Sequence, residues 1–292
     1  MAINYADSFE TELQQKYERE LTSSALTTDK ARFVGAKNIK IPRLTLSGYK
    51  DHTRSKGYNA GTLSNDYEIK TLMHDRDIEF FVDAEDIDET NQILSAANIT
   101  NTFTQEHAIP ELDCYRYSKL YTELATTYSK TVDTTTLSAA NVLTVFDELM
   151  EKMDEASVPE SGRILYVTPA VRKYMKEASD IQKIIIANGQ QANLKTIVHS
   201  LDDVNITMVP SARMKTAYNF TDGCVPGVGA KQINMILIHP SCVIAPVKRN
   251  SIYLWEPGTH TQGDGWLYQN RSYTDLFLIE NKADGCQMNV EA

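Results

Sequence analysis

The 292-residue sequence is 42% hydrophobic and 23% charged, with a mean hydropathy of −0.36, as expected for one large or two modest globular domains. It has no apolar run near the roughly 18 residues of a membrane span, and its N-terminus lacks the basic and apolar regions of a signal peptide. The net charge of −10 argues against nucleic acid as a tight ligand, because phosphate binding requires a basic surface.

The first predicted element is a short amphipathic helix over residues 7–21. Phe9, Leu13 and Tyr17 recur every fourth residue and form a narrow apolar stripe. The segment is too short to bury this stripe by itself, so we expect the stripe to contact another part of the protein or another copy.

A long polar segment, SGYKDHTRSKGYNAGTLSND at 47–66, follows the first predicted strand. Alternating apolar residues on both sides, over 39–46 and again from Tyr67 to Val82, indicate strands. Hairpin loops usually contain about two to five residues, and longer ones are commonly functional. The sequence therefore predicts an extended hairpin over 39–82 that contributes little to the core of its own subunit.

Two blocks of opposite charge flank this hairpin. Residues 30–56 contain eight Lys or Arg and one acid, and residues 75–89 contain eight acids and one Arg. Such blocks are usually solvated faces. Their equal size also suggests that they attract each other between subunits. The residues predicted for such a contact are Lys50, Arg54, Lys56, Asp83, Glu85, Asp86, Asp88 and Glu89.

A helical pattern continues from about residue 83 to 127 and contains Pro110. A proline followed by acidic residues is a good helix start, so this region is either two abutting helices or one long helix bent at Pro110.

The pattern then changes to alternating helices and strands. We expect a helix over 138–156, a strand over 163–167, and a second helix that begins at Thr168 and Pro169. Strands follow at 204–209 and 233–239, and the last fifty residues are predicted to be mostly strand. This order indicates a discontinuous two-domain α+β protein.

No motif in the sequence supports catalysis or cofactor binding. The GxSxG, HExxH and P-loop patterns are absent, and His239 and Cys242 lack the second ligand pair of a zinc site. The four cysteines show no CxxC spacing and are read as ordinary thiols. We therefore predict no enzyme activity, no metal and no cofactor.

Six segments in order resemble tailed-bacteriophage major capsid proteins. They are DAEDIDETNQ, IPELDCYRYSKL, VPESGRILYVTPAVRKYMK, MVPSARM, INMILIHP and GWLYQNRSYTDLFLIENKADG. The resemblance extends over nearly the whole chain and implies the Hong Kong 97-type capsid fold, with an N-arm, an extended E-loop hairpin, a P domain with a long spine helix, and an A domain. It implies a structural protein that forms the icosahedral shell around a double-stranded DNA genome.

The resemblance also implies an organisation. Residues 1–38 correspond to the N-arm, 39–82 to the E-loop, 83–131 to the P domain with its spine helix, 132–238 to the A domain, and 239–292 to strands that return to the P domain. The implied partners are other copies in pentamers and hexamers, a portal, and packaged DNA held by weak non-specific contacts, with no membrane. The implied location is the virion, after assembly in the cytoplasm of the host bacterium.

Many or some relatives in this family have two features in which this sequence differs from them. Many carry a scaffolding segment before the N-arm, whereas this sequence begins at the arm. We therefore expect either the processed form of such a protein or, the preferred alternative because the sequence begins with Met1, a full product that uses a separate scaffolding protein. Some cross-link neighbours through a lysine and an asparagine. Lys50 and Lys56 lie in the corresponding loop, but no asparagine or glutamate partner can be assigned, so cross-linking is not expected.

Two other functions are compatible with parts of the sequence. An encapsulin-type cellular compartment would use the same fold, and neighbouring genes would distinguish it from a phage shell. A Cys/His hydrolase using Cys114 or Cys242 would require a reactive thiol of low pKa, for which no local sequence feature argues.

Overall fold

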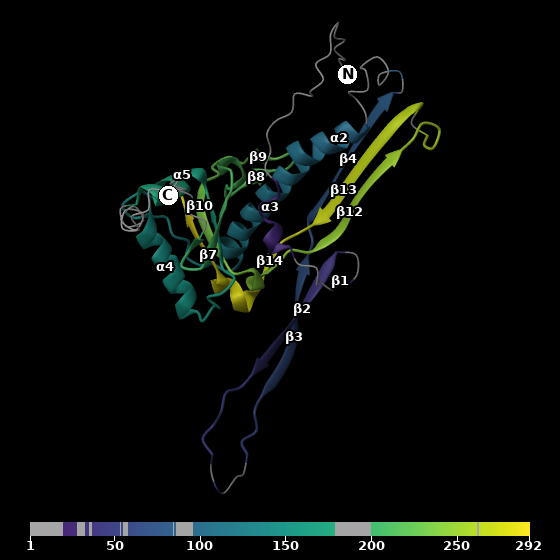
Figure 1. The fold of residues 1–292 in the computed structure, drawn as a ribbon. Coiled ribbons are helices and arrows are strands. Elements are labelled where there is room, and N and C mark those ends of the chain that lie inside the picture. Colours follow the sequence, from purple (N-terminus) through teal and green to yellow (C-terminus); the bar gives the residue numbers. More distant parts are fainter. Residues whose placement is uncertain are drawn as a thin grey trace.

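The structure is a computed structural model that describes residues 20–27, 33–34, 37–52, 54, 58–83, 85, 96–178, 200–261 and 263–292. A long helix runs between two sheets, and a two-stranded ribbon projects away from both (Figure 1). This mixed helix and sheet composition agrees with the prediction. None of the helices in the described ranges has the length and apolar character needed to span a membrane.

The central helix is continuous from α2 (Ala96–Phe103) through α3 (Ile109–Tyr121) to Thr127. The two connecting turns, Thr104–Ala108 (η2) and Thr122–Thr127 (η3), are π-helical, and their flanking residues keep helical backbone angles. Pro110 follows the first π turn, where the wider turn accommodates a residue that cannot donate a backbone hydrogen bond. Of the two alternatives, the structure therefore supports one long helix.

The larger sheet has the strand order β15-β10-β5-β7-β6. Its strands are β5 (Ile164–Val167), β6 (Ser200–Leu201), β7 (Val204–Met208), β10 (Ile233–Ile238) and β15 (Cys286–Val290). Only β5 and β7 are parallel, and α5 (Pro169–Glu177) lies in the connection between them.

Helices cover both faces of this sheet, which explains why its central strands are almost entirely apolar. Leu165 and Leu237 face α4 (Val142–Glu155) and α5, where they join Phe146 in one core. The alternate residues, such as Tyr166, face α3 and join Tyr117 in a second core.

Two predictions for this region need correction. Helix α4 begins at Val142 rather than Ser138, because Ser138 and Asn141 form a hydrogen-bonded turn before it. The final strand β15 pairs with β10, so the strands after residue 238 do not all return to the other sheet. This short strand, CQMNV, was not predicted, although its polar and apolar residues alternate.

The second sheet consists of three long antiparallel strands in the order β12-β13-β4. They are β4 (His74–Asp83), β12 (Val247–Trp255) and β13 (Gly265–Thr274). Phe80 and Tyr268 pack against Phe103 of α2, so one face of the sheet lies on the long helix. A side chain at Gly265 would lie 2.3 Å from the carbonyl oxygen of Val82, so only glycine allows this close pairing with β4.

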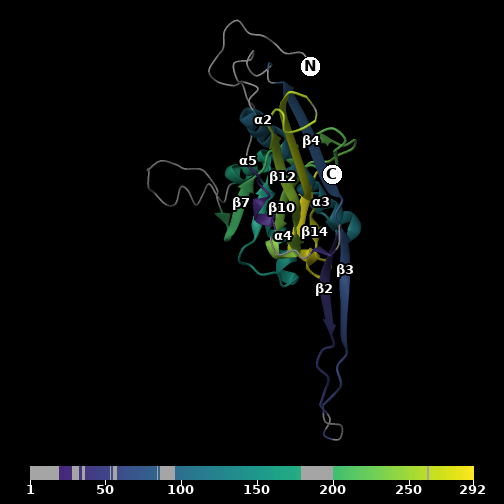
Figure 2. The ribbon, with the colours of Figure 1, turned by 90° about the vertical axis from the view of Figure 1, so that its right-hand side faces the viewer.

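The ribbon is formed by β2 (Asn38–Leu46) and β3 (Leu63–Thr71), with the two-residue strand β1 (Phe33–Val34) beside its base. Figures 1 and 2 both show it projecting away from the two sheets. The predicted hairpin of 39–82 is too long, because β4 pairs with β13 and belongs to the second sheet. The base is anchored by a small core of Ile39, Leu72, Tyr273 and Phe277.

Short elements complete the fold. They are η1 (Ser24–Leu26), η4 (Ser211–Arg213), β8 (Tyr218–Asn219), β9 (Val225–Pro226), η5 (Pro240–Cys242), β11 (Val243–Ile244), β14 (Phe277–Leu278) and η6 (Glu280–Gly285).

Candidate assembly surface

The ribbon has two chemically different faces, which follow from its register. Leu46 lies opposite Leu63, Pro42 opposite Tyr67, and Lys40 opposite Ile69, while Leu44 lies opposite Asn65. Directly opposed residues of an antiparallel pair share a face, so these side chains lie on one side of the ribbon. We call Leu44, Leu46, Leu63, Tyr67 and Ile69 the apolar ribbon face.

The other face is polar along the shaft and attached to the subunit at its base. Thr45 and Ser64 form its outer pair. Arg43 binds Glu280 at 2.7 Å. Nearer the base, Lys70 Nζ lies 3.0 Å from Tyr128 Oη and 3.0 Å from Glu68. Burial alone would lower the pKa of Lys70, but these partners and the charge of Glu123 raise it above its ordinary value.

The apolar ribbon face is unusually exposed for its composition. The relative exposure of its members runs from 52% for Tyr67 to 70% for Leu63. Beyond β1, which pairs with β2 only through Phe33 and Val34, neither strand has an outer partner in the part of the chain that the structure describes. A two-stranded ribbon of this kind is at best marginally stable alone, and its open edges favour pairing with another chain.

A second exposed apolar group lies on β12, an edge strand of the three-stranded sheet. Ile252, Tyr253, Leu254 and Trp255 are consecutive and are each between 40% and 51% exposed. Because successive side chains of a strand point to opposite faces, these four residues expose apolar surface on both faces of the sheet at this edge. The molecule therefore exposes two separate sets of large apolar side chains, both on strands with a free edge.

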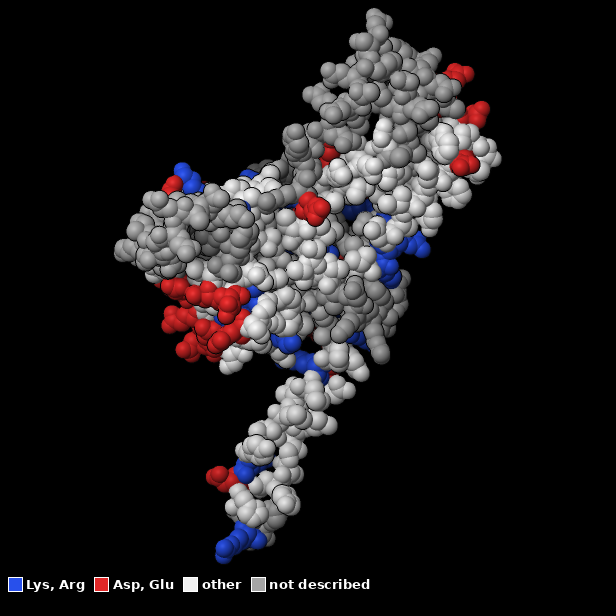
Figure 3. Space-filling model, in the orientation of Figure 1, with Lys and Arg blue, Asp and Glu red and all other residues white. Residues whose placement is uncertain are grey.

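The charged residues predicted for intersubunit contact are not brought together within the subunit. Lys50 and Arg54 lie in the connection between β2 and β3, where Lys50 donates to the carbonyl oxygen of Ala60. Charged side chains of the ribbon gather toward its outer end (Figure 3). Asp83 ends β4 at the far end of the second sheet from the ribbon (Figure 1), and its carboxylate accepts from the backbone of Glu85.

This arrangement corrects one part of the charge hypothesis. Of the acidic block, only its first residues lie at the base of the ribbon, and Asp75 there is already bound to Arg271 at 2.6 Å. Lys56, Asp86, Asp88 and Glu89 lie outside the described residues, as do Phe9, Leu13 and Tyr17. The intersubunit role of all these residues stays a prediction.

Sequence reasoning missed the apolar ribbon face because it began the second strand at Tyr67. Leu63 lies in the apparently polar segment 47–66, although β3 begins there. The signal was present, since Leu63, Tyr67 and Ile69 share one phase of a period of two, interrupted only by Asn65.

A buried polar cluster holds residues 20–27 against the long helix. Asp113 of α3 accepts hydrogen bonds from the backbone of Thr22 and Ser23 and binds Arg213 of η4 at 3.0 Å. Arg116 donates to the carbonyl oxygen of Ser23. Asp113, Arg116 and Arg213 are each at most 3% exposed. Residues 20–27, which belong to the predicted N-arm of 1–38, are therefore fixed by buried charges rather than by apolar packing alone.

His74, at the start of β4, makes the free energy of unfolding depend on pH. It stacks on Tyr115 with ring centroids 3.8 Å apart, and burial together with the charge of Arg76 lowers its pKa to about 4. The unfolded chain binds more protons than the folded chain between pH 6.5 and about 4, so the free energy of unfolding falls as the pH falls through this range.

We expect His74 to account for a loss of about 3 kcal/mol between pH 7 and pH 4, and His74→Phe to remove most of this dependence while keeping the ring stack. Urea unfolding at both pH values measures the effect. His52→Phe, in the exposed connection of the ribbon, is the matched control and should leave the dependence unchanged. An undiminished pH dependence in His74→Phe would contradict this assignment.

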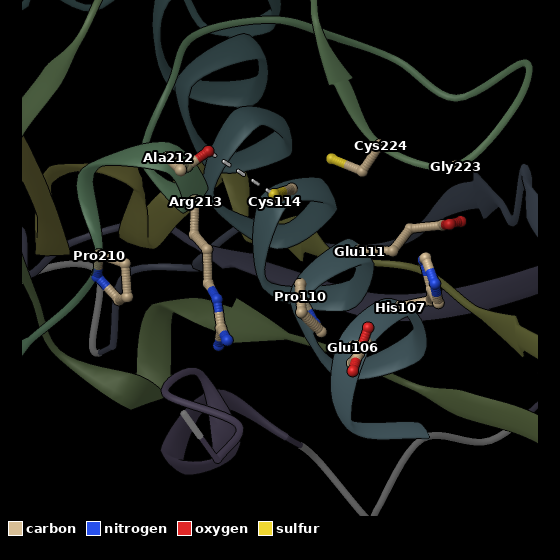
Figure 4. A pocket seen from close by; sticks show the side chains of 10 residues that line it. All are labelled: Glu106, His107, Pro110, Glu111, Cys114, Pro210, Ala212, Arg213, Gly223 and Cys224. Carbon is tan, nitrogen blue, oxygen red and sulfur yellow. Dashed lines mark hydrogen bonds between the residues drawn. The ribbon is translucent and has the colours of Figure 1, made fainter. Parts of the chain in front are cut away.

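Neither cysteine considered for hydrolysis has the geometry of a Cys/His pair. Burial raises the pKa of Cys242 to about 12, and its thiol donates to the carbonyl oxygen of Gly285. Cys114 donates to the carbonyl oxygen of Ala212, while His107 stacks on Phe103 and points away from it (Figure 4). Among the described residues, no three His, Cys, Asp or Glu side chains are grouped so as to hold a metal.

Comparison of the whole fold with solved structures gives a consistent result. A structure from Mycobacterium phage Che8 matches with a TM-score of 0.69 at 13% identity, covering 98% of this chain and 97% of the other. The mature capsid of bacteriophage PhiM1 matches with a TM-score of 0.71 at 12% identity, over 98% and 91% of the two chains. The capsid of cyanophage P-SCSP1u matches with a TM-score of 0.69 at 11% identity, over 99% and 93%.

The chain has the fold of phage capsid proteins. The predicted resemblance is thus confirmed at the level of the fold, over nearly the whole length of both chains in each comparison. No protein-family model and no curated protein match the sequence. In the part of the chain that the structure describes, the apolar ribbon face of this fold stays exposed.

Proposed function

We propose that this protein is the major capsid protein of a tailed bacteriophage and builds the icosahedral shell that encloses a double-stranded DNA genome. The observation that carries the proposal is the end-to-end match to capsid structures together with an apolar ribbon face that is exposed in the described part of the subunit. The role is structural rather than enzymatic.

In this proposal the subunit follows the Hong Kong 97-type organisation. The ribbon is the E-loop, the helix from α2 to α3 is the spine of the P domain, and the five-stranded sheet with α4 and α5 is the core of the A domain. Copies associate as pentamers and hexamers, with a separate scaffolding protein and a portal, in the cytoplasm of the host. Contacts with the packaged DNA are weak and salt-sensitive, because the chain carries a net charge of −10.

The ribbon attaches one subunit to the next mainly through its apolar face. Covering a side chain that is more than half exposed contributes about 1 kcal/mol, so the five residues together contribute roughly 5 kcal/mol before the entropy cost of association. An exposed ion pair contributes only about 0–1 kcal/mol. Lys50 and Arg54 therefore adjust the contact and its salt dependence, whereas the leucines and Tyr67 provide most of its free energy.

The purified protein is expected to sediment as pentamers, hexamers or shells, and negative-stain micrographs should show rings or closed particles. Sedimentation velocity at tens of micromolar protein, with and without the co-expressed scaffolding protein, tests this directly. A monodisperse monomer under both conditions would contradict the proposal. Shells that copurify with a cargo enzyme would instead identify an encapsulin-type compartment.

A further inference from the structure

Two of the four cysteines lie in one cavity between the long helix and the β8–β9 hairpin. The cavity has a volume of about 520 Å³, and its lining includes Cys114 of α3 and Cys224, which directly precedes β9. Figure 4 shows the two sulfur atoms on the same side of the helix, with Cys224 Sγ directed toward Cys114. The interaction between the two thiols lowers the pKa of Cys114 and raises that of Cys224.

We propose that Cys114 and Cys224 are a redox site that closes to a disulfide and fastens the β8–β9 hairpin to the long helix. This inference does not depend on the proposed capsid function. Both thiols are free in the reduced protein described here.

The hairpin is already held in the position that the bond requires. Phe220 packs edge-on against Tyr115, with ring centroids 5.7 Å apart, and against His74 at 5.6 Å. Tyr218 Oη donates to the carbonyl oxygen of Ala212 at 2.7 Å, the same oxygen that accepts from Cys114 Sγ. These contacts hold the β8 side of the hairpin against α3 and η4, so the turn that carries Cys224 is kept beside Cys114.

The environments of the two thiols suit a small peroxide as oxidant. The interaction with Cys224 lowers the pKa of Cys114, which favours the thiolate as nucleophile. Cys224 is half-buried, and Val225 beside it is exposed, so the cavity is reached from this side. Cys242 and Cys286, by contrast, are at most 1% exposed.

The reaction balances with hydrogen peroxide. The Cys114 thiolate attacks one peroxide oxygen, the O–O bond breaks, and the departing hydroxide takes up a proton to become water. The Cys224 sulfur then attacks the Cys114 sulfenic acid, the S–O bond breaks, and the second hydroxide leaves as water with the proton of Cys224. Two thiols lose two electrons in total, and the peroxide gains them.

Mass spectrometry of the peroxide-treated protein tests the site. After the remaining thiols are alkylated, digestion without reductant should give a peptide pair joining Cys114 to Cys224, which dithiothreitol separates. Free thiols should fall from four to two, because Cys242 and Cys286 stay reduced. The cross-link encloses a long segment of chain, so oxidation should raise the melting temperature by roughly 5 °C or more.

Two variants make the result specific. In Cys224→Ser the cross-link and the rise in melting temperature should vanish, and dimedone should trap the sulfenic acid at Cys114. Val225→Ser, which changes the neighbouring exposed residue and keeps both thiols, should still form the bond. Four free thiols after treatment of the folded protein, or a bond from Cys114 to any other cysteine, would overturn the proposal.

Discussion

Replacing Leu46 and Leu63 by glutamine should stop assembly at the level of isolated subunits or unstable capsomers. The two side chains form the outermost pair of the apolar ribbon face and are 64% and 70% exposed in the single subunit. The substitution removes about 2–3 kcal/mol from each ribbon contact, a roughly 30- to 150-fold weakening that is repeated at every interface of a shell. The melting temperature of the subunit should stay within about 2 °C, because neither side chain contributes to a core.

The adjacent pair on the opposite face provides the matched control. Thr45 and Ser64 lie one residue along each strand, so Thr45→Gln with Ser64→Gln places the same new side chains on the polar face. This variant should assemble like the parent protein in sedimentation velocity and negative-stain microscopy. Equal loss of assembly in both variants would show that the ribbon acts through its backbone or its shape rather than through its apolar face.

The sequence predicted the elements of this fold better than their pairing. Alternation or short runs of apolar residues located the ribbon strands, β5, β7 and β10, although the apolar face of the ribbon is exposed rather than buried. The same alternation could not show that β4 is not part of the hairpin and pairs with β13. In this pairing Phe81 lies opposite Leu267, which is nearly two hundred residues further along the chain. Strand pairing over such distances depends on tertiary packing, to which local periodicity is insensitive.

The candidate assembly surface was predicted only in part. The length and polarity of residues 47–66 correctly predicted a projecting hairpin. The contact residues predicted on it were charged side chains, whereas its exposed apolar face contains Leu44, Leu46 and Leu63. An exposed leucine cannot be distinguished from a buried one by its identity, because both occur in an alternating strand. Only the register, which places Leu46 opposite Leu63 and puts Leu44 on the same side of the ribbon, identifies the face.

Asp113→Asn should lower the free energy of unfolding by about 3–5 kcal/mol. The buried carboxylate accepts hydrogen bonds from Thr22 and Ser23 and also binds Arg213 at 3.0 Å. Asparagine keeps the shape but replaces one acceptor oxygen by a donor, and it removes the negative charge that the buried Arg213 guanidinium binds. Residues 20–27 should then detach from α3 more readily, which would loosen this part of the predicted N-arm.

Urea unfolding followed by circular dichroism measures this loss, and the exposed ion pair of Asp284 and Lys130 provides its control. Asp284→Asn removes a contact of 2.7 Å between side chains that are each more than 40% exposed, so it should cost at most about 1 kcal/mol. Adding Arg213→Met to Asp113→Asn should cost less than Arg213→Met does in the parent chain, since the ion pair between Asp113 and Arg213 is already lost. Equal costs for Asp113→Asn and Asp284→Asn, or strict additivity with Arg213→Met, would mean that buried charge does not hold this segment in place.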